Sequence, residues 1–198
     1  RYLNNPRDLY NDEFFRRFFP ELQPPKNQQP RKREQPNHKF RQSGMGSGSI
    51  IDTEGYILTN HHVVGEADKM VVVLYNGQER EAKLVGTDPE SDIAVVKIEG
   101  NGLPVLSMGD SDKILVGEDV IAVGNPFGLI QTVTYGIVSA KGRTNVGINE
   151  YENFIQTDAA INRGNSGGPL LYKGKILGLN STTLDKNLVE GISFSLHY

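Results

Sequence analysis

The sequence from residue 44 onward predicts an all-β domain, either a barrel or a sandwich. Short apolar segments follow one another there, separated by turns rich in Gly, Asn and Asp, as expected for antiparallel strands. No stretch shows the sustained 3.6-residue periodicity of an amphipathic helix. Both observations favour strands over helices in this part of the chain.

Eleven segments fit the strand pattern, and they form two groups on either side of residue 115. The first group has five segments, at 48–52, 56–59, 70–75, 79–86 and 93–98. The second group has six, at 119–124, 132–140, 153–157, 169–172, 175–181 and 190–196. The segments 62–67 and 110–115 could each hold a single helical turn.

Residues 1–43 have a different composition from the rest of the chain. They hold ten Lys and Arg against five Asp and Glu, and six of the ten prolines, whereas all 22 glycines follow them. An aromatic cluster, Phe-Phe-Arg-Arg-Phe-Phe at 14–19, precedes a tract at 20–41 that is too polar to fold by itself. We therefore expect the tract not to fold by itself, the aromatic cluster to dock elsewhere, and 44–198 to be the folded domain.

Composition excludes several classes of protein. The chain is 37% hydrophobic and 23% charged, which is ordinary for a globular domain, and no apolar run is long enough to span a membrane. The absence of cysteine excludes disulfides, a thiol nucleophile and a cysteine zinc site. The Gly-rich run at 44–48 lacks the Lys-Ser/Thr end of a phosphate loop and predicts a strand-entry turn. A basic tract at 26–41 leaves a polyanion-binding protein open, but such tracts are usually only solvated, and we expect no nucleic-acid partner.

The run Gly-Asn-Ser-Gly-Gly-Pro at 164–169 is the most informative stretch of the sequence. A serine framed by glycines can sit on a tight turn with its hydroxyl exposed, because glycine adopts backbone conformations closed to other residues. The amides of Gly164 and Ser166 could then converge on an oxyanion hole. A turn without function is the alternative, but this run is more specific than a loose G-x-S-x-G.

A serine nucleophile needs a base, and the chain offers four histidines. His38 lies in the basic tract and His197 is the penultimate residue. His61 and His62 remain, at the end of a predicted strand. Neighbours on a strand point to opposite faces, so at most one of them faces the site, and we choose His62 because it directly precedes two valines.

The base in turn needs a carboxylate that fixes its tautomer. Asp92 opens the apolar run 92–98 and so lies at a strand edge that leads into the core. Asp88 precedes a proline and is typical of a turn, and the remaining acids near the site look like turn or surface residues: Asp110, Asp112 and Asp158. The chain order His, Asp, Ser is that of chymotrypsin.

Three blocks resemble the catalytic blocks of the HtrA/Deg family of serine proteases. They are Thr-Asn-His-His-Val-Val at 59–64, Ser-Asp-Ile-Ala at 91–94 and Gly-Asn-Ser-Gly-Gly at 164–168. Further matches at 124–129 and 156–162 extend the resemblance over 44–195. The resemblance implies two perpendicular six-stranded antiparallel β-barrels, about 44–100 and about 116–198, with the triad His62, Asp92 and Ser166 in the cleft between them.

The resemblance also implies a biological setting. Family members are usually periplasmic or in the cell envelope of bacteria, trimer-based, and independent of metals, cofactors and ATP. They degrade unfolded or misfolded proteins in protein quality control and stress response, so we expect unfolded polypeptide substrates and a homotrimer or higher oligomer. Residues 1–43 resemble the family's long, variable loop after the first strand. The resemblance implies that they are a long flexible regulatory loop and that a sixth strand of the first barrel lies upstream of Arg1.

Chymotrypsin-like proteases build the substrate pocket from residues before the nucleophile and from a later strand. By position the pocket residues are Ala160, Ile161, Asn180, Ser181 and Thr182. They include no acid that could receive Arg or Lys, so small aliphatic side chains are expected.

Arg143 matches by position the family's sensor-loop arginine, a regulatory residue that relays peptide binding to the oxyanion loop, although it could be an ordinary turn charge. The span lacks the family's PDZ domain, and 191–198 departs from the family pattern, so PDZ-dependent regulation is not inferred. A resting, non-enzymatic peptide-binding or chaperone module using the same cleft is the alternative to an endopeptidase.

Overall fold

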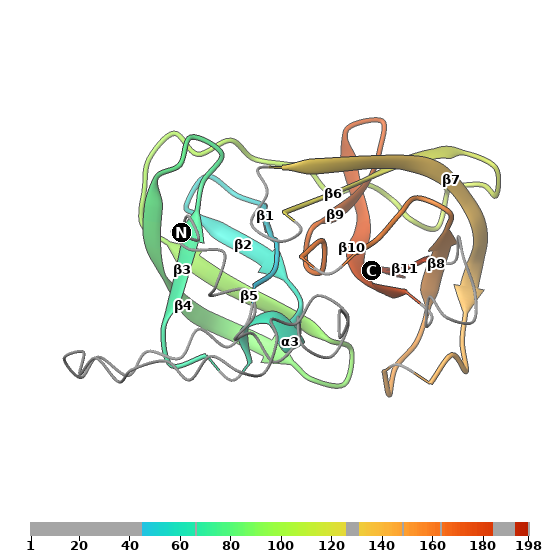
Figure 1. The fold of residues 1–198 in the computed structure, drawn as a ribbon, viewed down its shortest axis with the longest axis horizontal. Helices are drawn as coiled ribbons and strands as arrows, with labels where there is room; N and C mark the ends of the chain where they lie inside the picture. Colours follow the sequence, from blue (N-terminus) through green and yellow to red (C-terminus); the bar gives the residue numbers. More distant parts are fainter. Residues whose placement is uncertain are drawn as a thin grey trace, which may run out of the picture. The chain divides into compact units, whose positions relative to one another are not determined.

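The computed structural model describes residues 45–65, 67–125, 131–147, 149–162, 164–183 and 193–197. The predicted loop at 1–43 and its aromatic cluster lie outside these residues. Nearly all regular structure in the described part is β-strand, which confirms the predicted all-β class (Figure 1). None of the helices in these ranges is long and apolar enough to cross a membrane.

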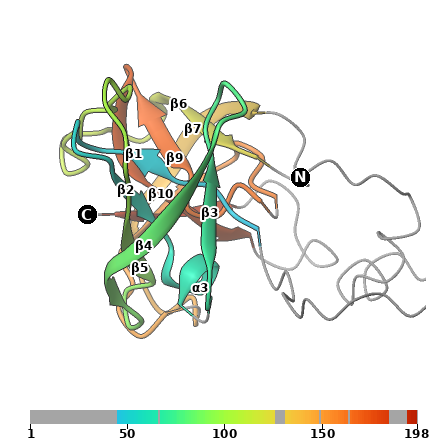
Figure 2. The ribbon, with the colours of Figure 1, turned by 90° about the vertical axis from the view of Figure 1, so that its left-hand side faces the viewer.

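The first half of the domain is a curled antiparallel sheet of five strands (Figure 2). The strands are β1 (Ser49–Ile50), β2 (Tyr56–Thr59), β3 (Met70–Val73), β4 (Glu79–Asp88) and β5 (Ile93–Ile98), in the order β1-β2-β5-β4-β3. Alternate residues of β5 are buried, as expected for a strand with one face on a core. That core contains Ile57, Ala94, Val96 and Ile98.

The second half is a closed antiparallel barrel of six strands. The strands are β6 (Asp119–Gly124), β7 (Thr132–Arg143), β8 (Phe154–Thr157), β9 (Pro169–Tyr172), β10 (Lys175–Thr183) and β11 (Ser193–His197). Around the barrel they run β10-β11-β8-β7-β6-β9. Its interior is filled by fully buried apolar side chains, among them Val120, Ala122, Val138, Ile155 and Leu170.

All eleven predicted strands are present; β2, β5, β6 and β9 have the predicted ends, and the ends of the others are shifted. The first is only Ser49–Ile50, and β3 ends at Val73 because the chain turns through Asn76 and Gly77, where glycine has φ +81°. The second barrel has its six predicted strands. The first sheet has five strands within the described residues, so the expected sixth strand stays a prediction.

The two halves share a third apolar cluster. Leu58 comes from the first sheet, whereas Phe154 and Leu179 come from the barrel. All three are buried, and partly buried residues from both halves pack around them. This shared core holds the end of β2 close to β8 and β10, which carry or adjoin the predicted site residues.

Candidate active site

The two candidate histidines lie on a helical turn, α3 (His61–Val64), which directly follows β2. They therefore follow the strand and do not lie on it, and the single helical turn allowed for at 62–67 is present at His61–Val64. The turn still separates the two rings. His61 Nδ1 lies 2.6 Å from Thr87 Oγ1 on β4, whereas His62 Nδ1 lies 2.8 Å from Asp92 Oδ2. The choice of His62 as the candidate base thus agrees with its contacts.

Asp92 is nearly buried, at 7% exposed, and both of its carboxylate oxygens accept hydrogen bonds from His62. The backbone N–H of His62 donates to Oδ1 at 2.9 Å, and Nδ1–H donates to Oδ2 at 2.8 Å. An ionised carboxylate only accepts, so this contact places the ring proton on Nδ1 and leaves Nε2 with a free lone pair. That tautomer is the one a general base requires.

The turn before β5 presents Asp92 in an uncommon conformation. Asp92 has φ +57°, in the left-handed region that aspartate tolerates better than most residues. The turn is closed by Asp88, whose carboxylate accepts hydrogen bonds from the Ser91 hydroxyl at 2.5 Å and the Glu90 N–H at 3.1 Å. The Ser91 hydrogen bond is the main cause that lowers the pKa of Asp88.

The main chain of Asp92 is also held, by a residue that the sequence did not single out. The side-chain amide of Asn60, which is fully buried, donates to the Asp92 carbonyl at 2.9 Å. Asn60 occupies the N-cap position of α3, yet its side chain makes no capping bond there. The sequence did offer one signal for Asn60, since asparagine is a common N-cap residue and this one directly precedes the two histidines. It could not show that the side chain of Asn60 bonds the Asp92 carbonyl.

The candidate nucleophile Ser166 lies on a tight turn between β8 and β9. Gly164 and Gly167 have φ +97° and +82°, which only glycine adopts readily, so the glycine frame is required by the turn. The Ser166 hydroxyl donates to the Ser181 carbonyl at 3.0 Å. Within the described residues it makes no hydrogen bond to His62. The structure thus joins His62 to Asp92 but leaves Ser166 turned to β10.

The predicted oxyanion donors are the backbone N–H groups of Gly164 and Ser166. Neither donates to an acceptor among the described residues, although the neighbouring amides of Asn165 and Gly167 do, to the carbonyls of Asn162 and Asn180. Arg163, which shares a peptide plane with the Gly164 N–H, lies outside those residues. The Ser166 N–H is therefore a backbone donor beside the candidate nucleophile that no described group occupies.

The predicted pocket residues have different surroundings. Ile161 is 2% exposed, Ala160 is exposed, and Thr182 follows Ser181 on β10. Asn180 is fully buried, and its side-chain amide donates to the carbonyls of Val123 and Pro169 at 3.1 Å each. The side-chain amide of Asn180 is thus used inside the barrel, and its main chain is bonded to the nucleophile turn, with its N–H donating to the Gly168 carbonyl and its carbonyl accepting from the Gly167 N–H.

Ser181 has a second contact that the sequence did not reveal. Its hydroxyl donates to Asp92 Oδ2 at 3.4 Å, from a strand 89 residues further along the chain. The same residue accepts the Ser166 hydroxyl through its carbonyl. Ser181 therefore touches both the carboxylate and the nucleophile, although its position predicted only a pocket wall.

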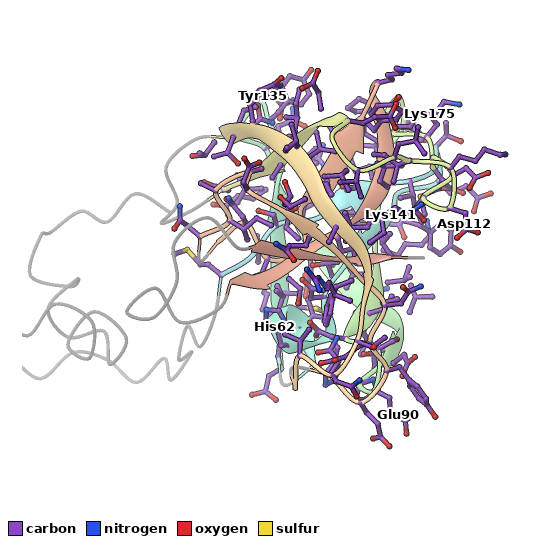
Figure 3. All side chains as sticks on the ribbon, turned by 90° about the vertical axis from the view of Figure 1, so that its right-hand side faces the viewer. His62, Glu90, Asp112, Tyr135, Lys141 and Lys175 are labelled. Atoms are coloured by element: carbon purple, nitrogen blue, oxygen red, sulfur yellow. The ribbon has the colours of Figure 1, made fainter. Side chains whose placement is uncertain are left out.

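Arg143 lies at the end of β7 and pairs with Phe154 on β8. Its Nε donates to Gln156 Oε1 at 3.0 Å. Figure 3 labels His62 and, nearer the lower end of the domain, Glu90. The regulatory assignment of Arg143 stays a prediction.

Comparison with known proteins shows which proteins this domain is similar to. Residues 46–179 match the model of the trypsin-like peptidase domain. The chain is 50% identical over 181 residues to a probable periplasmic serine endoprotease DegP-like of Chlamydia muridarum, covering 91% of this chain and 35% of that protein. A protein of the same description from Pseudomonas putida is 50% identical over 92% of this chain and 38% of its own length. The chain thus spans about a third of the length of these relatives.

Two solved structures have the same architecture. The HtrA-type protease AlgW with a decapeptide has a TM-score of 0.75 and 50% identity, over 77% of this chain and 48% of that chain. A serine endoprotease from Yersinia pestis has a TM-score of 0.70 and 43% identity, over 81% of this chain and 56% of that chain.

Proposed function

The chain belongs to the HtrA/Deg group of the trypsin-like peptidase family, and on that premise we propose that it is a serine endopeptidase with Ser166 as nucleophile. The observation that carries the proposal is the His62–Asp92 pair at 2.8 Å, with the tautomer of a general base, in one domain with a glycine-framed serine. These groups supply a base, an orienting carboxylate and a nucleophile.

In the proposed reaction the Ser166 oxygen attacks the carbonyl carbon of a peptide bond. The hydroxyl proton passes to His62 Nε2, and Asp92 stabilises the imidazolium that forms. The backbone N–H groups of Gly164 and Ser166 receive the negative oxygen of the tetrahedral intermediate. The proton then moves from His62 to the leaving amine, and water releases the acyl group from Ser166 by the same steps.

The proposed substrates are unfolded or misfolded polypeptides, cleaved without ATP in the periplasm or cell envelope. The names of the relatives support this setting, since they are described as periplasmic serine endoproteases. We propose a homotrimer or higher oligomer as the working form, on the family resemblance. For the pocket we propose the five residues expected from their position: Ala160, Ile161, Asn180, Ser181 and Thr182.

Labelling with a fluorophosphonate tests the proposal directly, because this reagent reacts only with an activated serine. We expect the protein to label at Ser166 and to cleave unfolded casein. The Ser166→Ala protein should lose both activities while its melting temperature stays nearly unchanged, since a part-buried hydroxyl on a turn contributes little to the core. Full casein cleavage by Ser166→Ala would end the assignment.

One observation favours a second candidate, a resting peptide-binding or chaperone module that uses the same cleft. The Ser166 hydroxyl donates to the Ser181 carbonyl and must leave it before it can donate to His62. The two candidates differ in the labelling rate. A resting module would bind unfolded casein without cleaving it and would label slowly. A protein whose Ser166 hydroxyl turns readily to His62 would label at the rate of an active protease.

We also propose that Arg143 regulates the movement of the Ser166 hydroxyl from the Ser181 carbonyl to His62. Its guanidinium lies beside β8, which leads toward the nucleophile turn. Activating peptides should therefore lose their effect on the labelling rate in Arg143→Ala.

A further inference from the structure

Ser47 joins the first half of the domain to the nucleophile turn. It lies in the glycine-rich run that precedes β1, for which the sequence predicted only a strand-entry turn. Its backbone N–H donates to the Ser166 carbonyl at 2.8 Å. Its hydroxyl donates to the Gly164 carbonyl at 2.6 Å, across 117 residues of sequence. One residue therefore binds the carbonyls on both sides of Asn165.

The Ser47 hydroxyl also accepts a hydrogen bond, from the backbone N–H of Asn125 at 2.8 Å. Asn125 directly follows β6, so the hydroxyl links the barrel wall, the strand-entry turn and the nucleophile turn. It uses one donor and one acceptor position, and both partners are main-chain groups. Replacement by alanine would remove both of these short hydrogen bonds and leave between the two groups the longer bond from the Asn125 N–H to the Gly164 carbonyl, at 3.3 Å.

These contacts fix the peptide planes around the candidate oxyanion donor. Because a peptide unit is planar, holding a carbonyl also sets the direction of the next N–H. The plane after Gly164 is held at Ser47 and, through the Asn165 N–H, at Asn162. The plane after Ser166 is held at Ser47 and, through the Gly167 N–H, at Asn180.

The plane between these two carries the Ser166 N–H. Its carbonyl, that of Asn165, accepts from the Gly168 N–H at 2.9 Å, and its N–H has no acceptor among the described residues. The Ser166 N–H, which has no acceptor among the described residues, thus lies between two peptide planes that are each held by hydrogen bonds at both the carbonyl and the N–H. This is the arrangement that a preorganised oxyanion hole needs.

We propose that Ser47 is a positioning residue for catalysis, which aims the Ser166 N–H at the developing oxyanion. The proposal rests on the endopeptidase function proposed above. Ser47 does not touch the substrate; it acts through the carbonyls of Gly164 and Ser166.

The close fit around Ser47 supports the same role. Gly167 approaches so closely that a Cβ there would lie 2.3 Å from the Ser47 carbonyl oxygen and 2.2 Å from Thr59 Oγ1. The Thr59 hydroxyl donates to that same carbonyl at 2.7 Å. The Thr59 side chain of the first half therefore holds the Ser47 carbonyl while Ser47 holds the nucleophile turn.

Ser49 supplies a matched control two residues along the chain. It is 3% exposed, and its hydroxyl has no hydrogen-bond partner among the described residues. Ser49→Ala therefore removes a hydroxyl from the same segment without removing a hydrogen bond to the nucleophile turn. Any general effect of deleting a serine hydroxyl near β1 should appear in both variants.

The experiment compares the unsubstituted protein with Ser47→Ala and Ser49→Ala. It measures kcat and KM on a peptide substrate, inhibition by a peptide boronate that mimics the tetrahedral intermediate, and the melting temperature. We expect Ser47→Ala to lower kcat on the order of 10-fold to 100-fold with KM within about twofold, as for small misplacements of reacting groups. The boronate affinity should fall by the same factor as kcat/KM, and Ser49→Ala should match the unsubstituted protein.

Thr59→Val is the second variant, since it removes the hydroxyl that holds the Ser47 carbonyl and keeps the side-chain shape. It should lower kcat in the same direction by a smaller factor, and Ser47→Thr, which restores a hydroxyl, should recover part of the Ser47→Ala loss. Unchanged kcat and boronate affinity in Ser47→Ala would overturn the inference, as would equal losses in Ser49→Ala. Failure of the unsubstituted protein to label or cleave would instead refute the proposed function.

Discussion

The base side and the nucleophile side of the candidate site are built differently. His62 and Asp92 lie 30 residues apart in the first half of the domain, and their hydrogen bonds are complete. Ser166 lies in the second half, where its hydroxyl is bonded to Ser181 and not to His62. Its turn is held by Ser47, 117 residues before Gly164, and by Asn180 on β10. The base is thus ready in this structure, whereas the nucleophile still has to be turned to it.

This difference locates where activity could be controlled. The contacts of His62 and Asp92 come from α3, its N-cap Asn60 and the turn before β5, with a further one from Ser181. The nucleophile turn depends on long-range contacts from three separate segments, so a change in any of them could reorient it. Control of activity is therefore expected to act on the nucleophile side.

The strongest test on the base side is Asp92→Asn. The amide would present a donor to His62 Nδ1 and would favour the wrong tautomer, so kcat should fall on the order of 10⁴-fold. Peptide hydrolysis at saturating substrate measures this loss. A loss of less than about tenfold would show that the pair at 2.8 Å is not the catalytic base and its carboxylate.

On the nucleophile side, cleavage should be selective for Val, Ala or Ile as the residue that donates the carboxyl group. The buried, branched Ile161 would shorten the proposed pocket against aromatic side chains. One methylene in an apolar pocket changes discrimination by about 1–3 kcal/mol, or about 10-fold to 200-fold. A peptide library measures the preference, and a profile dominated by Arg, Lys or Phe would refute the pocket.

A smaller effect is expected where the barrel supports the turn before Asp92. The Tyr151 N–H donates to the Glu90 carbonyl at 3.2 Å, and the Glu152 carboxylate accepts from the N–H groups of Val146 and Asn149. Glu152→Ala should loosen this loop and lower kcat a few-fold, because a lost hydrogen bond to a charged group is worth roughly 1.5–3 kcal/mol locally and only part of it reaches Asp92. Glu150→Ala, an exposed change in the same loop, is the control. Equal kcat values for both variants would show that this barrel loop does not support the turn before Asp92.

The smallest effect concerns Asp88 and pH. Its pKa is lowered chiefly by the hydrogen bond from Ser91, so the ionised form stabilises the folded turn. That contribution is present above the pKa of an ordinary aspartate and is lost as pH falls through the lower, folded value. Ser91→Ala should raise the pKa of Asp88 toward the ordinary value, as measured by NMR titration. An unchanged pKa of Asp88 in Ser91→Ala would show that the weaker causes lower it, chiefly the backbone hydrogen bonds from Glu90 and Ser91.

The sequence was sufficient to predict most of the fold, for a local reason. Strands of period two between Gly, Asn and Asp turns are visible in short windows, so all eleven strands could be placed. The glycines at 164 and 167 likewise predict their own turn, because the positive φ values there are a property of those residues. The ends of β4 and β7 were missed, since pairing with a neighbour extends a strand beyond its own apolar pattern.

Only the tertiary structure decided how the site is held together. Which histidine faces Asp92 depends on a helical turn that a pair of identical residues does not reveal. The contacts of Ser47 with Gly164 and of Ser181 with Asp92 cross 117 and 89 residues. A serine has the same hydroxyl wherever it stands, and its partner is set by which strands the closed barrel and the shared core bring together. The residue types that can do the chemistry can therefore be read in the sequence, whereas the hydrogen bonds that Ser47 makes to the nucleophile turn and that Ser181 makes to Asp92 exist only once the two halves have folded against each other.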